Sequence, residues 1–189
     1  ILGDEQSNVL NGLSRHEILL GLSGNDLLLG NEGDDTLIGG LGNDTLAGGQ
    51  GQDVYIFNLG DGQDVINTHE NDLSNTQPSV DILRFGAGIR PQDIEFSFSG
   101  VQFSDDLVIK VKGTSDQVTV EHYFNAALTN QLAAIEFADG TVWSQTYLNQ
   151  MPIIILGDEQ SNVLNGLSRH EILLGLSGND LLLGNEGAE

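Results

Sequence analysis

The chain contains no cysteine and only six lysine and arginine residues among its 189 residues. The lack of cysteine excludes disulfide bonds, thiolate catalysis and thiolate metal ligands. The scarcity of basic residues leaves 28 acidic residues largely unopposed, and the net charge at neutral pH is −22. A chain this negative repels phosphate backbones and anionic lipids. Nucleic acid and anionic membranes are therefore disfavoured as partners.

Long hydrophobic runs and known catalytic signatures are also missing. The most apolar short run, residues 153–156, is far shorter than the roughly 20 residues that span a bilayer. The chain has no G-x-S-x-G, no H-E-x-x-H, no phosphate-binding G-x-x-x-x-G-K and no EF-hand loop. His122 beside Glu121 leaves a general base as a minor alternative. We therefore expect a protein without enzyme activity.

Glycine, in contrast, is abundant and regularly spaced. Four nonapeptides follow one another without a gap over residues 21–56, beginning with Gly-Leu-Ser-Gly-Asn-Asp-Leu-Leu-Leu. Each has glycine at its first and fourth positions, aspartate at its sixth and a large apolar residue at its eighth. This is the G-G-x-G-x-D-x-U-x pattern of a stacked repeat.

The period of nine predicts a turn of six residues followed by a strand of three. The turn requires glycine because its backbone must adopt positive φ angles. The eighth-position residues Leu28, Leu37, Leu46 and Tyr55 should point inward. A three-residue strand is only about 10 Å long, so a continuous core requires many stacked strands. We therefore expect an all-β fold, a parallel β-roll in which two nonapeptides form one coil with turns on two opposite edges.

The stacked turns should bring aspartates together, with Asp26 next to Asp44 on one edge and Asp35 next to Asp53 on the other. Carboxylates held that close repel each other unless a cation lies between them. Oxygen ligands without cysteine favour a hard cation, and a flexible shell of six to eight oxygens suits Ca²⁺ better than Mg²⁺. Backbone carbonyls of the turns should supply the remaining ligands. A flexible glycine-rich linker is the alternative, but a linker does not place leucine at every ninth residue.

These repeats resemble the RTX (repeats-in-toxin) family of secreted bacterial proteins. That family folds as a parallel β-roll and binds several Ca²⁺ ions between successive turns. The resemblance implies that turn residues join the aspartates as ligands. The turn residues concerned are Gly21, Ser23, Gly24, Gly30, Glu32, Gly33, Gly39, Gly40, Leu41, Gly42, Gly48, Gly49 and Gly51.

Residues 3–20 continue the period in a decayed form. Asn8 and Glu17 stand where the intact repeats have aspartate. Asn8 offers one neutral oxygen and Glu17 a longer carboxylate. We therefore expect these two turns to keep their strands and to bind metal more weakly.

Residues 57–66 are out of phase by two residues, yet Gly62, Asp64 and Ile66 preserve the ending of the motif. We interpret them as the last, irregular turn of the roll, with Asp64 stacked above Asp44 as a further ligand. A simple hairpin turn at Asp61 and Gly62 is the alternative.

We assign the roll to residues 1–66, and the nonapeptide periodicity ends after it. Residues 67–80 are a polar loop, where His69, Glu70 and Asp72 form a minor alternative metal cluster. Alternation predicts strands at residues 82–85, 94–98, 107–111 and 118–122, and a hairpin over residues 135–143 with an Asp-Gly turn.

Residues 81–86 (D-x-L-x-F-G) and 137–143 (F-x-D-G-T-x-W) resemble the domain that often follows RTX repeats. We expect residues 67–152 to form a mostly antiparallel flanking domain that covers the open end of the roll, because an exposed edge invites aggregation.

Residues 155–187 repeat residues 1–33 letter for letter, so a second roll begins in residues 153–189, with Asp180 as its intact ligand. This identity favours a tandem unit of a large adhesin, biofilm-matrix or surface protein outside the cell. The resemblance adds type I secretion, and neighbouring units and surface or matrix glycans are the expected partners besides calcium. Two alternatives are an accessory domain of a secreted protease, lipase or alginate epimerase, and a Ca²⁺-dependent carbohydrate-binding module with Tyr123 or Trp143 as a stacking platform.

Overall fold

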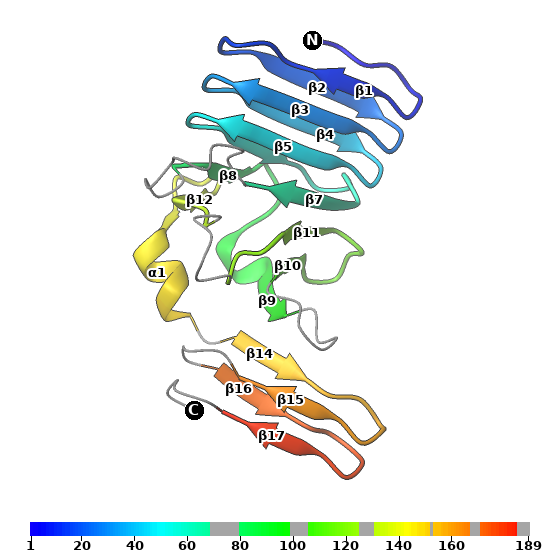
Figure 1. The fold of residues 1–189 in the computed structure, drawn as a ribbon, viewed down its shortest axis with the longest axis vertical. Helices are drawn as coiled ribbons and strands as arrows, with labels where there is room; N and C mark the ends of the chain where they lie inside the picture. The colour runs from blue at the N-terminus through cyan, green and yellow to red at the C-terminus, as the bar shows by residue number, and fades with distance from the viewer. Residues whose placement is uncertain (69–79, 99–105, 125–130, 152, 167–170, 185–189) are drawn as a thin grey trace.

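The computed structural model describes residues 1–68, 80–98, 106–124, 131–151, 153–166 and 171–184. The described chain is almost entirely β-structure, and its strands lie across the long axis of the molecule (Figure 1). The His69 cluster of the polar loop lies outside the described residues. None of the helices in the described ranges is long and apolar enough to cross a membrane.

The N-terminal part is a parallel β-roll, as the repeats predict. One sheet contains β1 (Val9–Asn11), β3 (Leu27–Glu32), β5 (Thr45–Gln50) and β7 (Gln63–Asn67). The other contains β2 (Ile18–Ser23), β4 (Thr36–Leu41) and β6 (Val54–Phe57). Strands pair with the strand two repeats ahead, for example Leu28 with Leu46, so two nonapeptides form each coil.

The strands of the central repeats are longer than the three residues predicted, and that prediction was wrong. Pairing continues through the first residues of the next turn, where Asn31 faces Gly49 and Glu32 faces Gln50. The second turn residue has a positive φ even where it is not glycine, with 83° at Leu22 and 73° at Asn31. The chain therefore bends into the turn without leaving the ladder of backbone hydrogen bonds.

Leucines at the eighth position fill the space between the two sheets. Leu19, Leu28 and Leu37 are completely buried, and Tyr55 continues their row. Each such side chain contributes about 1.5–3 kcal/mol by leaving water. The first-position glycines also point inward, and a methyl group at Gly30 would collide with Asp35 Oδ2 and with the Gly48 carbonyl oxygen. Glycine is required at that position for close approach rather than for a positive φ.

The irregular turn ends the roll on one side. β7 pairs in parallel with β5, and Leu46 faces Ile66 at a separation of two repeats plus two residues. The extra residues lie in the turn at residues 58–62. Residues 63–67 are therefore a strand of the roll, and the alternative of a simple hairpin is wrong.

The flanking region extends both sheets of the roll. In one sheet, β8 (Ile82–Phe85) pairs with β6 and β12 (Ala134–Glu136) pairs with β8, both in parallel, while β13 (Val142–Ser144) is antiparallel to β12. In the other sheet, β11 (Gln117–Val120) lies parallel to β7. β10 (Leu107–Val111) and β9 (Ile94–Phe98) follow in antiparallel order, and the 3-10 turn η1 (Pro91–Asp93) precedes β9.

The aromatic residues carry the core of the roll into this region. Phe85 contacts both Phe57 and Phe137, with ring centroids 6.0 Å and 5.5 Å apart, and Phe137 lies 4.7 Å from Trp143. The short helix α1 (Gln145–Gln150) follows and was not predicted. Ser144 caps it by accepting a hydrogen bond from Tyr147 N at 3.3 Å.

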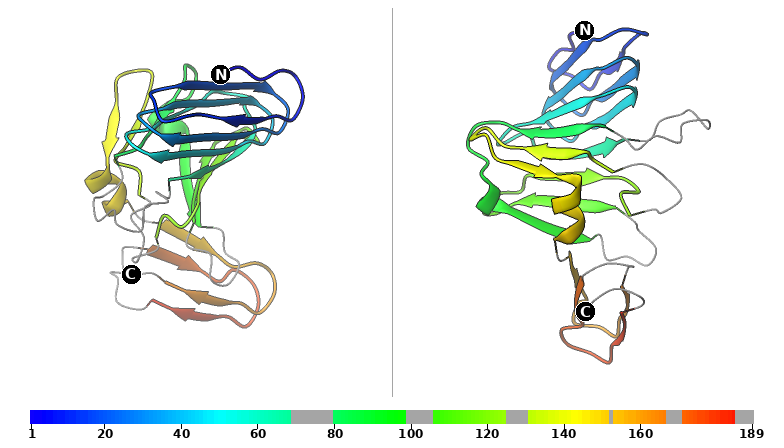
Figure 2. Two further views of the ribbon diagram at one scale, coloured as in Figure 1. Left: turned by 45° about the horizontal axis from the view of Figure 1, so that its top comes forward. Right: turned by 90° about the vertical axis from the view of Figure 1, so that its left-hand side faces the viewer.

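A second roll begins with β14 (Ile153–Leu156), β15 (Val163–Asn165), β16 (Glu171–Leu174) and β17 (Leu181–Leu183). β14 pairs with β16 and β15 with β17, in the same register as in the first roll. β14 also continues the sheet beyond β9, where Ile154 faces Ser97. A nine-stranded sheet thus runs from the first roll through the flanking region into the second, and Figure 2 shows the three parts stacked along one axis.

Candidate metal centre

The sixth-position residues form a row along each edge of the roll. On the first edge, Asn8 N donates to Asp26 Oδ1 at 2.7 Å and Asp26 N donates to Asp44 Oδ1 at 2.7 Å. Asp44 N then donates to Asp64 Oδ1 at 3.0 Å. Each aspartate therefore receives the backbone N–H of the preceding coil, and the three carboxylates are buried in a line.

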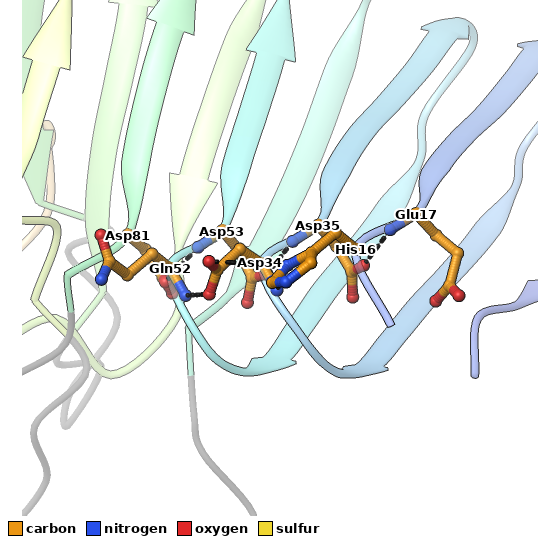
Figure 3. Close-up of polar contacts among 7 residues, drawn as sticks. All are labelled: His16, Glu17, Asp34, Asp35, Gln52, Asp53 and Asp81. Atoms are coloured by element: carbon orange, nitrogen blue, oxygen red, sulfur yellow. Dashed lines mark hydrogen bonds and ion pairs between the residues drawn. The ribbon is translucent and has the colours of Figure 1, made fainter. Parts of the chain in front are cut away.

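The second edge has the same arrangement, which Figure 3 shows from Glu17 to Asp81. Glu17 N donates to Asp35 Oδ1 at 2.7 Å, Asp35 N to Asp53 Oδ1 at 2.8 Å and Asp53 N to Asp81 Oδ1 at 3.0 Å. Asp81 was missed as a member of this row. Its signal was Asp81-Ile-Leu83, which repeats the Asp-x-apolar ending of the nonapeptide after a long insertion.

Four aspartates of these rows have one carboxylate oxygen without a donor among the described residues. The Oδ2 atoms of Asp26, Asp35, Asp44 and Asp64 are buried and accept no hydrogen bond within the described part of the chain. A buried carboxylate oxygen without a partner destabilises the fold by several kcal/mol. This arrangement needs a cation to be stable.

The space around these oxygens contains backbone carbonyls from the neighbouring coil. A methyl group at Gly21 would collide with both Asp26 Oδ2 and the Gly39 carbonyl oxygen, and Gly30 has the same surroundings. Over the described ranges, no three His, Asp or Glu side chains are arranged to hold a metal alone. An ion would therefore be bound by two carboxylates and turn carbonyls, a set of hard oxygen ligands that fits Ca²⁺.

The predicted carbonyl ligands lie in these turns, but not all are free of the backbone ladder. The Leu41 carbonyl accepts a hydrogen bond from Gly24 N at 2.9 Å. The fourth-position glycines Gly24, Gly33, Gly42 and Gly51 have φ angles between 112° and 141°, which turn the chain back toward the aspartate. The assignment of individual carbonyls to ions stays a prediction.

Burial makes the charged form of these aspartates unfavourable when no ion is bound. Burial is the larger cause and the nearest carboxylates a smaller one, and together they raise the pKa of Asp44 to about 6 and the pKa of Asp64 to about 8. The pKa of Asp35 is raised mainly by burial as well. A divalent cation would reverse this penalty because it stabilises the ionised carboxylates.

The decayed turns differ in what their side chains bind. Asn8 Oδ1 accepts from Asp4 N at 2.7 Å, and Glu17 Oε2 accepts from Leu13 N at 3.0 Å. These oxygens are thus bonded within their own turns. This geometry supports the expectation of weaker sites at Asn8 and Glu17, which stays a prediction.

The second roll begins a ladder of the same kind. Asn162 N donates to Asp180 Oδ1 at 2.9 Å, as Asn8 N does to Asp26 in the first roll. Asp180 is half-buried, and a methyl group at Gly175 would collide with its carboxylate.

A second row of polar contacts lies outside the aspartates, at the fifth position, and sequence analysis missed it. Asn43 N donates to Asn25 Oδ1 at 2.9 Å and Gln63 N donates to Asn43 Oδ1 at 3.0 Å. On the other edge, Asp34 N donates to His16 Nδ1 at 2.8 Å (Figure 3). This row runs in the opposite direction to the aspartate row, so each turn is bound to both neighbours. The signal was a hydrogen-bonding side chain at every fifth position.

Two alternative sites are not favoured by the structure. Tyr123 and Trp143 are only 1% and 8% exposed, so the prediction that either forms a stacking platform for sugars was wrong. β11 ends at Val120, before Glu121, and His122 lies in the following turn with a φ of 53°. His122 N donates to Asp106 Oδ1 at 2.8 Å.

Comparisons with known proteins agree with this geometry. The family model for the RTX calcium-binding nonapeptide repeat (four copies) matches residues 20–55 and 165–189. The haemolysin-type calcium binding protein related domain matches residues 106–147. A search of curated proteins finds no match.

Among solved structures, the chain is similar to the solution structure of the AlgE6R3 subunit from the Azotobacter vinelandii mannuronan C5-epimerase. The two share 28% identity over 72% of this chain and 81% of that one, with a TM-score of 0.49. The ladders of buried aspartate and the matching family models give one result: the chain carries RTX calcium-binding nonapeptide repeats beside a haemolysin-type calcium-binding-protein-related domain, and the ion that its repeats bind is Ca²⁺.

Proposed function

We propose that the chain is an extracellular structural module that folds and stiffens when it binds Ca²⁺, as one unit of a large surface or matrix protein. The observation that carries this proposal is the set of buried carboxylate oxygens at Asp26, Asp35, Asp44 and Asp64, which have no donor in the part of the chain that the structure describes. These oxygens oppose folding in the absence of an ion and favour it when an ion is bound.

The charge of the chain supports a conformational change of the whole roll. Arg15 is the only basic residue in residues 1–56, whereas carboxylates recur in every repeat. Self-repulsion of this kind keeps a chain expanded when no cation is present. Ions that bind only the folded state stabilise it by RT ln(1 + [L]/Kd) each, which is about 1.4 kcal/mol per site at ten times Kd. Several modest sites together therefore suffice to drive folding.

The same energetics support a location outside the cell. Extracellular calcium modules typically bind with Kd values of about 10⁻⁴ to 10⁻³ M. Such sites are empty at cytosolic calcium levels, and the unit remains unfolded and suited to export through a secretion channel. The letter-for-letter recurrence of residues 1–33 at residues 155–187 supports a tandem array over a single accessory tail of a secreted enzyme.

A calcium titration of the 189-residue chain tests the proposal. We expect little β-signal in circular dichroism with EGTA and a cooperative gain of β-signal as Ca²⁺ rises into the millimolar range. Mg²⁺ at equal ionic strength controls for charge screening and should produce a much smaller change. A full β-spectrum in EGTA that Ca²⁺ leaves unaltered would contradict the proposal.

A further inference from the structure

The two letter-for-letter copies allow one sequence to be compared in two surroundings. Residues 155–187 repeat residues 1–33, so Ile155 is the equivalent of Ile1. Ile155 is only 2% exposed, whereas Ile1 is 48% exposed. Because the two copies have the same sequence, this difference comes from the neighbours of each copy. The neighbour of Ile155 is the flanking region.

The backbone of the flanking region meets the second roll at β9. One side of β9 pairs with β10 in antiparallel order, and the other side pairs in parallel with β14, where Ile154 faces Ser97. Figure 1 shows β14 directly beyond β9. An edge strand leaves a row of backbone N–H and C=O groups unpaired. β14 therefore covers the edge of β9 and begins the second roll at the same time.

Phe124 connects the apolar cores of the two parts. Ile155 and Leu164 form a small buried cluster, and Phe124 packs against it. Phe124 also packs against the main core, which runs from the first roll through the flanking region. The neighbouring Tyr123 is buried and lies edge-on to Phe124, with ring centroids 5.0 Å apart. A buried neighbour thus holds Phe124 in place at the edge of the flanking region.

The described part of the second roll has little stabilisation of its own. Its sixth positions hold Asn162, Glu171 and Asp180, so only one of them is an aspartate. Leu182 at an eighth position is 43% exposed, whereas the equivalent Leu28 is completely buried. Short strands that bury little apolar area do not offset the conformational entropy lost on folding. The contacts with the flanking region are therefore a large part of what stabilises this roll.

We propose that β9 and Phe124 form a docking surface for the first strand of a following roll, here residues 153–156, and that this surface nucleates the calcium-dependent folding of that roll. The inference rests on the proposed calcium-dependent folding. The first coil of a solenoid is the costliest to order, because it has no neighbour on which to stack. A preformed edge supplies that neighbour, so fewer or weaker calcium sites suffice for the following roll. The flanking region thus ends one roll and starts the next.

The lack of cysteine allows each roll to be followed separately, because one introduced cysteine reports on one place. Leu10→Cys and Leu164→Cys occupy equivalent positions of the two copies, and both side chains are buried. Alkylation by iodoacetamide at saturating Ca²⁺, relative to alkylation in EGTA, gives a protection factor for each roll in the full 189-residue chain. Phe124→Ala is then added to each of these two variants.

Phe124→Ala should lower the protection factor of Leu164→Cys at least about fivefold, since it removes an aromatic ring from the junction. The protection factor of Leu10→Cys should change less than about twofold, because distant sites behave independently. Trp143 is the only tryptophan and is buried in the flanking region, so its fluorescence reports whether that region stays folded.

Ile155→Ala tests the same junction from the side of the roll, and Ile1→Ala is its matched control. Ile155→Ala should also lower the protection factor of Leu164→Cys at least about fivefold. Ile1→Ala truncates a half-exposed side chain and should change the protection factor of Leu10→Cys less than about twofold. This pair provides the decisive comparison where Phe124→Ala alters the Trp143 fluorescence.

The order of folding separates nucleation from simple contact. After Ca²⁺ is added to the ion-free chain, Trp143 should become buried before the cysteine of Leu164→Cys becomes protected. Phe124→Ala should delay only the second event, because removal of a contact in the folding nucleus slows folding. Protection of Leu164→Cys before burial of Trp143, or equal protection factors with and without the Phe124 ring, would overturn the inference. A chain in which Ca²⁺ protects neither cysteine would refute the proposed function itself, so the two failures are distinguishable.

Discussion

The substitution Asp44→Asn should have opposite effects on the ion-free and the calcium-bound folded states. Asp44 lies in the middle of the first-edge row, where its Oδ1 accepts from Asp26 N at 2.7 Å and its Oδ2 has no donor among the described residues. Burial raises its pKa from 3.8 to about 6. At pH 7, this shift destabilises the ion-free folded state by about 3 kcal/mol. Screening by nearby solvent reduces that value to roughly 2 kcal/mol.

Asparagine keeps the acceptor for Asp26 N and removes the charge. The ion-free folded state, populated by an excluded osmolyte such as trimethylamine N-oxide, should therefore gain roughly 2 kcal/mol of stability in EGTA. In Ca²⁺ the same variant loses ligand charge, and its folding midpoint should rise at least about tenfold. Both quantities are read from the circular dichroism signal of the roll during osmolyte and Ca²⁺ titrations.

Asp34→Asn is the matched control. Asp34 lies one residue before a ladder aspartate, is exposed, and accepts from Gln52 N at 3.0 Å through Oδ1. This variant loses the same charge and keeps the same kind of hydrogen bond, so both midpoints should move less than about twofold. Equal behaviour of Asp44→Asn and Asp34→Asn would refute the reasoning, because general repulsion would then explain the effect of calcium.

Three further predictions concern pH, backbone strain and the core. In EGTA, the stability of the folded state should rise as pH falls from 8 to 4, because the raised pKa values of Asp44 and Asp64 make the folded state bind more protons than the unfolded state. The apparent affinity for Ca²⁺ should fall over the same pH range, because protons compete with the ion for these carboxylates. Osmolyte titrations in EGTA and calcium titrations, each at several pH values, check the two expectations. Leu22→Gly should stabilise the calcium-bound fold by about 1 kcal/mol in urea unfolding, because glycine relieves the backbone strain of a φ of 83°. Leu41 does not have a positive φ, so Leu41→Gly should not stabilise the fold. Leu37→Ala should destabilise the calcium-bound fold by about 2–5 kcal/mol and broaden thermal unfolding, and a loss below 1 kcal/mol would argue against a tightly packed row of leucines.

The repeat pattern was sufficient to predict the roll because its two constraints are local and periodic. The eighth-position leucines had to face inward, and aspartates 18 residues apart, such as Asp26 and Asp44, had to meet once two repeats formed a coil. The register of the irregular turn could also be predicted, because Asp64 and Ile66 keep the ending of the motif.

Other features depend on contacts that no periodic pattern contains. Asp81 joins the second edge across an insertion of ten residues, and its place follows only from the pairing of β6 with β8. The strands exceed three residues because Leu22 and Asn31 adopt positive φ without breaking the ladder, which glycine-based reasoning does not anticipate. The helix α1 is a single short segment whose only local signal is Ser144 as its N-cap. Asp116 accepts a hydrogen bond from Gly60 N, 56 residues earlier in the sequence, and the two meet only through the fold.

The orientation of the strands determines how the unit responds to mechanical load. Strands lie across the long axis, and β1 and β17 stand at opposite ends of it (Figure 1). Tension along that axis therefore breaks the hydrogen bonds between strands one coil at a time, instead of shearing all strands together. Each coil that detaches releases 18 residues, or roughly 60 Å of extended chain. If such units form the tandem array proposed above, the array would lengthen in steps under load and refold as calcium binds again.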